Sequence, residues 1–457
     1  MVGADFLQLH PSTAPPRGLR TWLTAALRAA VADGRLPVGA RLPATRGLAA
    51  ELGVSRGVVV DAYERLVDEG VLAGHRGGGT TVLAAAPAPV RSALGRSTTP
   101  VELDLSPGVP DLSAFPCAAW LRAEREVLAS LDAADLGYGD PRGTLELRQA
   151  LAVRLARTRG IRADPQDLLV VNGVAQGLSL LAQVLRDRGR TAVGLEDPGS
   201  GSIRDQLERW GLSAVPVPVD DLGVDVGALT ATGLDAVVLT PAHQFPTGVV
   251  LAPQRRRALL TWARGTRLIV EDDYDAEHRY DRPPVAALHS LAPEHVCYAG
   301  SVSKTLAPAL RLGWLLAPTA LRDDLVERKQ WSDITSPALG QLVLARLMTS
   351  GAFDRHLRIA RVRHRRRRDA VLAALAEHLP GAQVHGVAAG LHLLVSMPEL
   401  DDDVELVAQA RRAGVAVHPL SRHRQREGSA GLVIGYAACP PDQLREAIRR
   451  LGTLAGH

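Results

Sequence analysis

The stretch YAGSVSKTLAPALRLGWL, residues 298–315, decides the fold of the larger part of this 457-residue chain. An apolar run leads into a serine-rich turn that carries Lys304, and Arg311 follows seven residues later. A lysine amine can form a Schiff base with a carbonyl compound, while hydroxyl groups and an arginine fork bind a dianionic phosphate. The stretch therefore predicts a site for a phosphorylated carbonyl compound, in which Ser301, Ser303 and Arg311 serve the phosphate.

Lysine is rare in this chain. Of 53 basic residues, only Lys304 and Lys329 are lysines. Arginine stays protonated and cannot form a Schiff base. Both lysines are therefore candidates for a role that arginine cannot fill.

An acidic cluster lies upstream of Lys304, in LIVEDDYDAEHRY, residues 268–280. An apolar strand delivers Asp272 and Tyr274 at its end. A carboxylate there can keep a pyridine nitrogen protonated, which makes the ring an electron sink, and the tyrosine can bind a ring hydroxyl. Alone, such a cluster could equally be a metal site or a solvated turn. Its position after a strand and before the lysine favours a ring-shaped cofactor.

A second predicted phosphate contact lies in LLVVNGVAQGLSLL, residues 168–181, where glycine separates a strand from a helix. The backbone N–H groups of Val174 and Ala175, together with Gln176, can bind phosphate at the start of that helix.

Two further stretches add candidates. TPAHQFPTG, residues 240–248, follows another strand, so His243 and Gln244 could face the ring. In LGYGDPRGTLELR, residues 136–148, Tyr138 could reach a phosphate across a dimer interface.

The periodicity divides the chain into parts. Residues 12–84 form a first domain, and the Pro-, Ser- and Thr-rich residues 85–100 read as a linker. Residues 101–457 alternate short apolar strands with helices, which indicates an α/β domain with a largely parallel sheet. From about residue 351 a long helix, strands and a terminal helix predict a small α+β subdomain. The expected strands of the α/β part are Asp167–Val171, Ala192–Leu195, Ala236–Leu239, Arg267–Val270 and Val296–Ala299.

The first domain has the pattern of a helix-turn-helix. Residues Leu19–Ala32 are periodic, and Thr45 can cap a helix that runs to about Leu52. Gly53 then provides the turn, and Ser55 caps a second helix to about Glu69. Residues 71–83 (VLAGHRGGGTTVL) read as a hairpin with a glycine-rich tip.

This domain resembles the GntR-type winged helix in GRLPVGARLPATRGLAAELGVSR, in AYERLVDEGVL and in the glycine-rich hairpin. The resemblance implies that the N-terminal end of the second helix enters the DNA major groove. For any single arginine, solvation of a helical surface remains the alternative. The residues expected to contact DNA are Arg46, Ser55, Arg56, His75, Arg76 and Gly78.

The motifs of the larger domain resemble those of fold-type I pyridoxal-phosphate enzymes, which have the aspartate aminotransferase fold. Their order, together with the winged helix, resembles the MocR/GabR-type regulators of the GntR superfamily. The resemblance implies pyridoxal 5'-phosphate as cofactor, Lys304 as its Schiff-base lysine, Asp272 as the pyridine partner and Tyr274 as the ring-hydroxyl partner. It also implies a head-to-tail homodimer on double-stranded DNA.

Two departures from that family concern the ligand. Ser200 follows EDPG where the family usually has a tyrosine stacked on the ring. Aminotransferases and the GABA-sensing member of the family have an arginine near the C-terminal strand that binds a carboxylate, but residues 431–437 (GLVIGYA) contain none. Ser202 stands where the GABA-sensing member has a second arginine. A response to GABA is therefore not expected, although Arg422 or Arg424 could substitute. Residues 431–437 and the preceding HPLSRH resemble members that respond to pyridoxal phosphate and control vitamin B6 synthesis.

Alternatives remain open from the sequence. The effector could be another amino acid that reacts with the bound cofactor. The chain could be a working aminotransferase with a fused DNA-binding domain, or a regulator that has lost the cofactor. The arginine-rich helix of residues 354–370 is expected to be a solvated helix, with an accessory phosphate contact to DNA as the alternative.

Bulk properties fit these expectations. A hydrophobic content of 46% and a charged content of 22% predict a globular protein. The sequence contains no apolar run of about 18 residues, so no membrane span is predicted. The N-terminus lacks a signal-peptide pattern, and a cytoplasmic location is therefore expected. Three distant cysteines predict buried free thiols and no metal site. The net charge of +4 is compatible with nucleic-acid binding.

Overall fold

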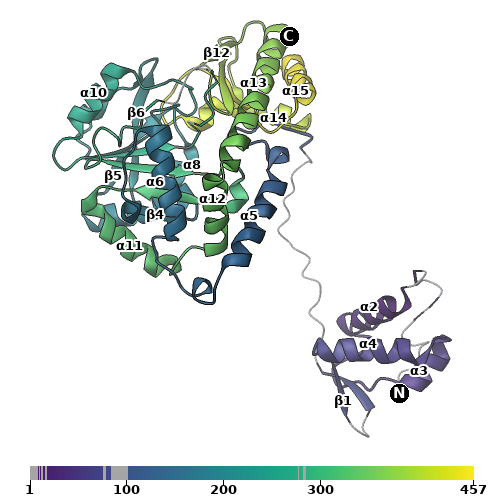
Figure 1. The fold of residues 1–457 in the computed structure, drawn as a ribbon. Coiled ribbons are helices and arrows are strands. Elements are labelled where there is room, and N and C mark those ends of the chain that lie inside the picture. Colours follow the sequence, from purple (N-terminus) through teal and green to yellow (C-terminus); the bar gives the residue numbers. More distant parts are fainter. Residues whose placement is uncertain are drawn as a thin grey trace. The chain divides into compact units, whose positions relative to one another are not determined.

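The computed structural model describes residues 9, 11, 14–15, 18–75, 79–83, 101–275, 277–280, 285–386 and 388–456. The chain divides into two units, residues 1–97 and residues 98–457, whose elements are drawn in Figure 1. The predicted linker, residues 85–100, lies outside the described residues.

The first unit is a winged helix-turn-helix, as predicted. Its elements are α2 (Leu19–Ala32), α3 (Thr45–Leu52), α4 (Arg56–Asp68), β1 (Leu72–His75) and β2 (Gly79–Val82). The two strands pair antiparallel and form the predicted hairpin. Apolar side chains from all three helices and both strands meet in one buried core, which holds the three helices in fixed orientation.

The helix starts differ in detail from the predicted caps. Thr45 is the first residue of α3 and not its cap, because Ala44 still has extended backbone while its carbonyl accepts the Leu48 N–H. Ser55 does cap α4 by position, but its side chain makes no capping hydrogen bond. Gly53 ends α3 with a φ of 65°, a left-handed conformation that favours glycine.

An eight-stranded sheet forms the centre of the second unit, in the order β4-β11-β10-β9-β8-β5-β6-β7. All strands run parallel except β11 and β7. This confirms the largely parallel sheet, and β9 and β10 extend further at their carboxyl ends than predicted. The strands are β4 (Leu168–Val171), β5 (Ala192–Asp197), β6 (Ser213–Asp220), β7 (Gly223–Val224), β8 (Ala236–Leu239), β9 (Leu268–Asp273), β10 (Val296–Ser301) and β11 (Gly313–Leu316).

Helices cover both faces of this sheet (Figure 1), so its central strands are buried throughout. One buried cluster joins the sheet to α7 and α11, and another joins it to α5, α6 and α12. The helices are α5 (Cys117–Ser130), α6 (Leu145–Arg159), α7 (Val174–Asp187), α8 (Gly201–Arg209), α9 (Val226–Ala231), α10 (Pro253–Trp262), α11 (Thr319–Asp333) and α12 (Ala338–Thr349).

The C-terminal part is an α+β subdomain around a four-stranded antiparallel sheet, β12-β13-β16-β15. It also takes in β3 (Leu103–Asp104) from the start of this unit, which pairs parallel with β14. Neither β3 nor α14 was expected here. The remaining elements are α13 (Ala352–His378), β12 (Gln383–His385), β13 (His392–Ser396), α14 (Asp403–Arg412), β14 (Val415–Ala416), β15 (His418–Pro419), β16 (Gly431–Gly435) and α15 (Pro441–Leu454).

The cysteines are free, but the prediction that all are buried is wrong for one of them. Cys297 and Cys439 are buried, whereas Cys117 is exposed. Cys117 opens α5 directly after Pro116, at a helix end where solvent reaches the side chain. Among the described residues, no helix is long and apolar enough to cross a membrane.

Candidate functional site

The predicted chemical groups gather where parallel strands of the large sheet end. Asp272, near the end of β9, lies opposite Ala299 of β10, and Lys304 follows the end of β10. Carboxyl ends of parallel strands share one edge of a sheet, where open α/β folds bind their ligands. The sheet topology therefore brings the predicted lysine and carboxylate together.

Lys304 is half-buried at this edge. Its Nζ donates a hydrogen bond of 2.6 Å to the carbonyl of Gly108. Burial lowers the pKa of the Lys304 amine, and the carboxylates of Asp272 and Asp275 oppose that shift. A lowered pKa increases the neutral fraction of the amine, which is the nucleophilic form.

Asp272 is buried, and its Oδ1 has no hydrogen-bond partner among the described residues. Burial raises the pKa of this carboxyl to about 7, Asp273 and Asp275 add to the rise, and Lys304 opposes it. A buried acceptor without a donor is costly. A protonated pyridine nitrogen is the kind of donor that this oxygen lacks, so Asp272 fits the role predicted for it.

Tyr274 belongs to a hydrogen-bonded group at the same edge. Nδ1 of His243 lies 2.8 Å from Oδ2 of Asp275 and 3.1 Å from the Tyr274 hydroxyl. Burial and the Asp275 carboxylate raise the pKa of Tyr274 well above its usual value, so the phenol keeps its proton. Asp275 was missed in the sequence, although it directly follows Tyr274 in the acidic cluster.

His243, Asp275 and His392 also place three metal-ligating atoms within 4.8 Å of one another. The ring of His243 is already bonded to Asp275 and Tyr274, and Nε2 of His392 lies 3.2 Å from the Pro246 carbonyl. Nδ1 of His243 and Nε2 of His392 are thus used in hydrogen bonds, whereas Nδ1 of His392 is buried without a partner among the described residues.

The predicted phosphate contacts meet at the start of α7. Nη2 of Arg311 donates a hydrogen bond of 2.6 Å to the carbonyl of Asn172. Gly173 caps the helix with a φ of 78°, and a Cβ there would lie 2.9 Å from the Arg311 guanidinium. The amides of Val174 and Ala175 begin the helix and have no acceptor within it. Arginine and helix start thus form one cradle of N–H groups.

Other predicted residues support the site indirectly. Gln176 uses its side chain on the turn, because Oε1 accepts from the Asn172 N–H at 2.7 Å and Nε2 donates to Asp333 at 2.8 Å. Oγ of Ser301 accepts from the N–H of Ser303 at 3.4 Å. Gln244 is buried, and its Nε2 donates hydrogen bonds to the carbonyls of Pro198 and Phe245.

The loop that carries Arg422 and Arg424 lies beside the EDPG turn, a position that the sequence could not supply. The Gly199 N–H donates to the His423 carbonyl at 2.7 Å, and Asp197 accepts from the N–H of Gln425 at 2.8 Å. Ser200 is the N-cap of α8, where its Oγ accepts from the Ile203 N–H at 3.4 Å. The guanidinium of Arg424 donates to the Ser429 carbonyl at 2.6 Å.

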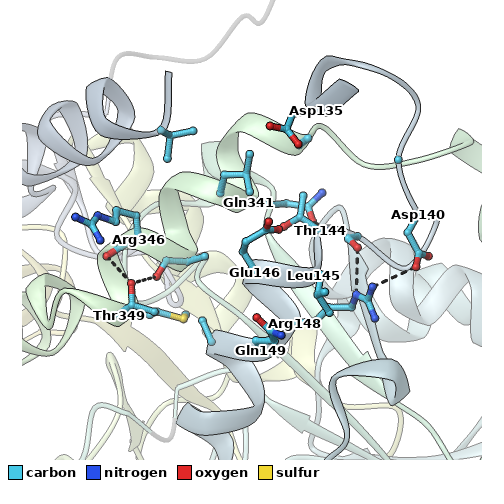
Figure 2. Close-up of a pocket in the computed structure, with 18 of the residues that line it drawn as sticks. Asp135, Asp140, Thr144, Leu145, Glu146, Arg148, Gln149, Gln341, Arg346 and Thr349 are labelled. Atoms are coloured by element: carbon cyan, nitrogen blue, oxygen red, sulfur yellow. Dashed lines mark hydrogen bonds and ion pairs between the residues drawn. The ribbon is translucent and has the colours of Figure 1, made fainter. Parts of the chain in front are cut away.

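Tyr138 lies in the loop before α6 and is 87% exposed. The same loop borders a cavity of about 1060 Å³ between α5, α6 and α12. Figure 2 shows that Arg148 reaches Asp140 at the edge of this cavity, a contact of 3.1 Å. Lys304, Asp272 and Arg311 are not among the cavity's lining residues.

The predicted DNA contacts lie at the turn of the first unit and on its hairpin. Arg46 is exposed near the start of α3, and Ser55 and Arg56 are exposed at the start of α4. His75 is the last residue of β1, whereas Arg76 and Gly78 lie outside the described residues. Arg46, Ser55 and Arg56 therefore lie at helix starts, and His75 lies at the end of a hairpin strand.

Comparison with known proteins covers nearly the whole chain. The family of aminotransferases of class I and II matches residues 101–451, and the gntR family of bacterial regulatory proteins matches residues 20–82. The HTH-type pyridoxine biosynthesis transcriptional regulator PdxR of Corynebacterium glutamicum is 35% identical, over 94% of each chain. The probable rhizopine catabolism regulatory protein MocR of Rhizobium meliloti is 32% identical, over 93% of this chain and 91% of the relative.

Solved structures match the second unit. An archaeal alanine:glyoxylate aminotransferase aligns with a TM-score of 0.72 and 27% identity, over 78% of this chain and 91% of its own. The kynurenine aminotransferase of Pyrococcus horikoshii aligns with a TM-score of 0.71 and 26% identity, over 79% and 91%. With a winged helix in front of an aminotransferase fold, and similarity over more than nine-tenths of the chain to the regulators PdxR and MocR, this chain belongs to the MocR/GabR-type transcriptional regulators of the GntR superfamily.

Proposed function

We propose that this regulator binds pyridoxal 5'-phosphate at Lys304 and that the cofactor, or its adduct with an amine, controls DNA binding. The observation that carries the proposal is the meeting of the Lys304 amine, the unpartnered Asp272 carboxylate and the Arg311 cradle at one sheet edge. Similarity to a regulator of pyridoxine biosynthesis supports pyridoxal phosphate itself as the signal and vitamin B6 synthesis as the regulated process.

Each part of the cofactor has a matching group in this proposal. Lys304 would take the aldehyde, Asp272 the pyridine nitrogen and Tyr274 the ring hydroxyl, while the start of α7 and Arg311 would hold the phosphate. When bound, the cofactor supplies an aldehyde and an electron-accepting ring. Ser200 offers no aromatic face, and the missing stacking would weaken binding by about 0.5–1.5 kcal/mol without abolishing it.

The contact between Lys304 and Gly108 suggests how the signal leaves the site. Gly108 belongs to the segment that continues the chain after the predicted linker. That segment is anchored by Leu105, which bonds to Ala416 and Gly435, and by Asp111, which bonds to Arg363. When an amine condenses with an aldehyde, two of its hydrogens leave with the aldehyde oxygen as water. The Nζ of Lys304 therefore cannot donate to the Gly108 carbonyl in the Schiff base as it does in the free amine. Binding of the cofactor would therefore alter the segment that leads to the DNA-binding unit.

Two copies are part of the proposal. Exposed apolar side chains lie on α5, α6 and α12, the helices around the cavity, and two of them, Leu145 and Val153, line it. Exposed apolar patches mark association surfaces. A head-to-tail homodimer would cover them and bring Tyr138 toward the partner's phosphate. It would also present two winged helices to two half-sites on double-stranded DNA. The exposed apolar residues on these helices are Leu121, Leu128, Leu145, Val153 and Leu339.

The test is a titration of pyridoxal phosphate, without any amine, into a complex of the full chain with DNA from upstream of its own gene. We expect a change in DNA affinity or footprint that is lost in Lys304→Ala. Lys304→Arg is the matched control, because arginine keeps the positive charge but cannot react with the aldehyde. If Lys304→Arg responds like the wild type, Schiff-base formation is not the signal.

A wild-type protein that takes up the cofactor but keeps its DNA complex unchanged would contradict direct sensing of pyridoxal phosphate. The effector would then be an amine that reacts with the bound cofactor. Amino acids added to the loaded protein would identify it.

An aminotransferase activity is the second candidate, because the solved structures similar to the second unit are aminotransferases. Incubation with a panel of amino and keto acids tests it. Turnover that persists without DNA would favour this function, and absence of turnover with any pair would leave regulation as the use of the site.

A further inference from the structure

The second lysine of the chain has an unexpected environment. Lys329 lies on α11, and its side chain is 0% exposed. Its Nζ pairs with Oδ1 of Asp333 at 2.7 Å, one helical turn further along. Burial lowers the pKa of the ammonium, while the hydrogen bond to Asp333 opposes the shift. A buried ion pair contributes little to net stability compared with apolar packing, so this one calls for a role of another kind.

Asp333 connects this lysine to the predicted phosphate site. Its Oδ2 accepts hydrogen bonds from Nδ2 of Asn172 at 3.0 Å and from Nε2 of Gln176 at 2.8 Å. The other end of the Gln176 amide accepts from the N–H of Asn172. One carboxylate therefore holds both sides of the turn that starts α7.

The same turn holds Arg311. The Asn172 carbonyl accepts the 2.6 Å bond from the Arg311 guanidinium, and Arg311 itself has a left-handed backbone, with φ of 52°. The contacts thus run without a break from the buried ammonium through Asp333 and Asn172 to the guanidinium.

We propose that Lys329 is a positioning residue for phosphate recognition: through Asp333 it fixes the turn at the start of α7 and the Arg311 guanidinium. This inference rests on the proposed function, since it takes the phosphate of pyridoxal phosphate as the ligand. The ammonium is too deeply buried to contact the ligand. Its effect is to hold the Asp333 carboxylate in place, so that the N–H groups of the cradle are ordered before the phosphate arrives.

The test compares two ligands that differ by the phosphate alone. Wild-type protein and Lys329→Met, which keeps the length but loses the charge, are each titrated with pyridoxal phosphate and with pyridoxal, followed by absorption. We expect the affinity for pyridoxal phosphate to fall about tenfold in Lys329→Met. The affinity for pyridoxal should stay within about twofold, because Lys304 and Asp272 are untouched. Arg328→Met is the matched control, because Arg328 is the neighbour of Lys329 on α11 and forms a surface ion pair with Asp187.

A fall in affinity that is equal for both ligands would overturn the proposal, because it would mean a general disturbance of the fold. The proposal would also be overturned if Lys329→Met preferred pyridoxal phosphate over pyridoxal by the same factor as the wild type. Should Lys329→Met fail to fold, Asp333→Asn tests the same link, because an amide has one accepting oxygen and cannot accept from Lys329 on one side and from Asn172 and Gln176 on the other, as the two carboxylate oxygens do. Wild-type protein that takes up neither compound would contradict the proposed function instead.

Discussion

At the scale of single residues, the Asp272 carboxyl combines burial with an unpartnered oxygen. Its folded-state pKa of about 7 lies above the ordinary value of 3.8, chiefly because of burial. A carboxyl whose pKa is raised in the folded state costs no folding stability at a pH where it is protonated in both the folded and the unfolded state. The cost then grows as pH rises from about 4 to about 7.

We therefore expect cofactor-free Asp272→Asn to be more stable than the wild type at pH 8. The gain should be on the order of a few kcal/mol in the free energy of unfolding and should shrink toward pH 5. Chemical unfolding at several pH values measures this. Asp221→Asn, at an exposed turn, is the control for charge removal alone. Equal pH profiles for the wild type and Asp272→Asn would refute the expectation.

Residue identity could be predicted where one residue type carries the chemistry by itself. Lys304 and Asp272 could be predicted because lysine is rare in this chain and because Asp272 lies near the end of an apolar strand upstream of that lysine. Gly108 and Asp333 could not be found, since each acts through a contact with a distant segment. Gln176 was placed at the right turn, but its amide faces Asp333, a partner that sequence spacing does not reveal.

At the scale of elements, the turn between α3 and α4 depends on one glycine. Gly53 has φ of 65°, and a Cβ there would meet no atom within 4 Å, so only backbone strain opposes a side chain. Gly53→Ala should lower the unfolding free energy of the first unit by about 1 kcal/mol. Gly47→Ala is the matched control, because Gly47 lies inside α3 in open space and should gain about 0.5–1 kcal/mol. If thermal unfolding shows that both variants gain or both lose stability, the left-handed backbone at Gly53 does not decide the effect of the substitution.

The arginines of α13 provide a second prediction at this scale. Arg363 and Arg367 both pair with the buried Asp111, at 2.6 and 3.0 Å, so part of this basic helix is used inside the molecule. Asp111→Ala leaves Arg367 buried without its carboxylate and should cost about 3–5 kcal/mol in unfolding free energy. Asp369 is exposed and its ion pair with Arg368 is 3.9 Å long, so Asp369→Ala should cost less than about 0.5 kcal/mol. Similar losses in denaturant unfolding of the two variants would argue against a structural role for the pair.

Element prediction succeeded where the pattern is local and failed where partners are distant. The ends of α2 and β8 match the prediction, because apolar periodicity and flanking turn residues define them. The two-residue strand β3 was missed, since its only ladder partner is β14, near the other end of the chain. The cap of α3 was misplaced by one residue because Ala44 takes the extended conformation without a polar side chain.

At the scale of the whole molecule, fold class and site follow from one property of the sheet. Parallel order places the ends of β5, β8, β9 and β10 side by side, so motifs scattered over the sequence become one site. Motif order could therefore predict the fold. The loop of Arg422 and Arg424, however, enters from the small subdomain, and its docking on Asp197 depends on how the two subdomains meet.

Association of two copies is the remaining question at this scale, and Val153 on α6 offers the sharpest test. Val153 is 70% exposed and lines the cavity between α5, α6 and α12, where a second copy would have to desolvate it. Val153→Glu should leave the monomer folded, because the side chain already faces water, yet it should shift a dimer toward monomer since a buried unpaired charge is costly. Sedimentation equilibrium measures the dissociation constant, for which we expect a rise of at least about tenfold. Val404→Glu, 55% exposed on α14 and away from the cavity, is the matched control and should leave the dissociation constant unchanged. A Val153→Glu protein that dimerises as tightly as Val404→Glu would place the interface elsewhere, and the proposed reach of Tyr138 into a partner's site would fall with it.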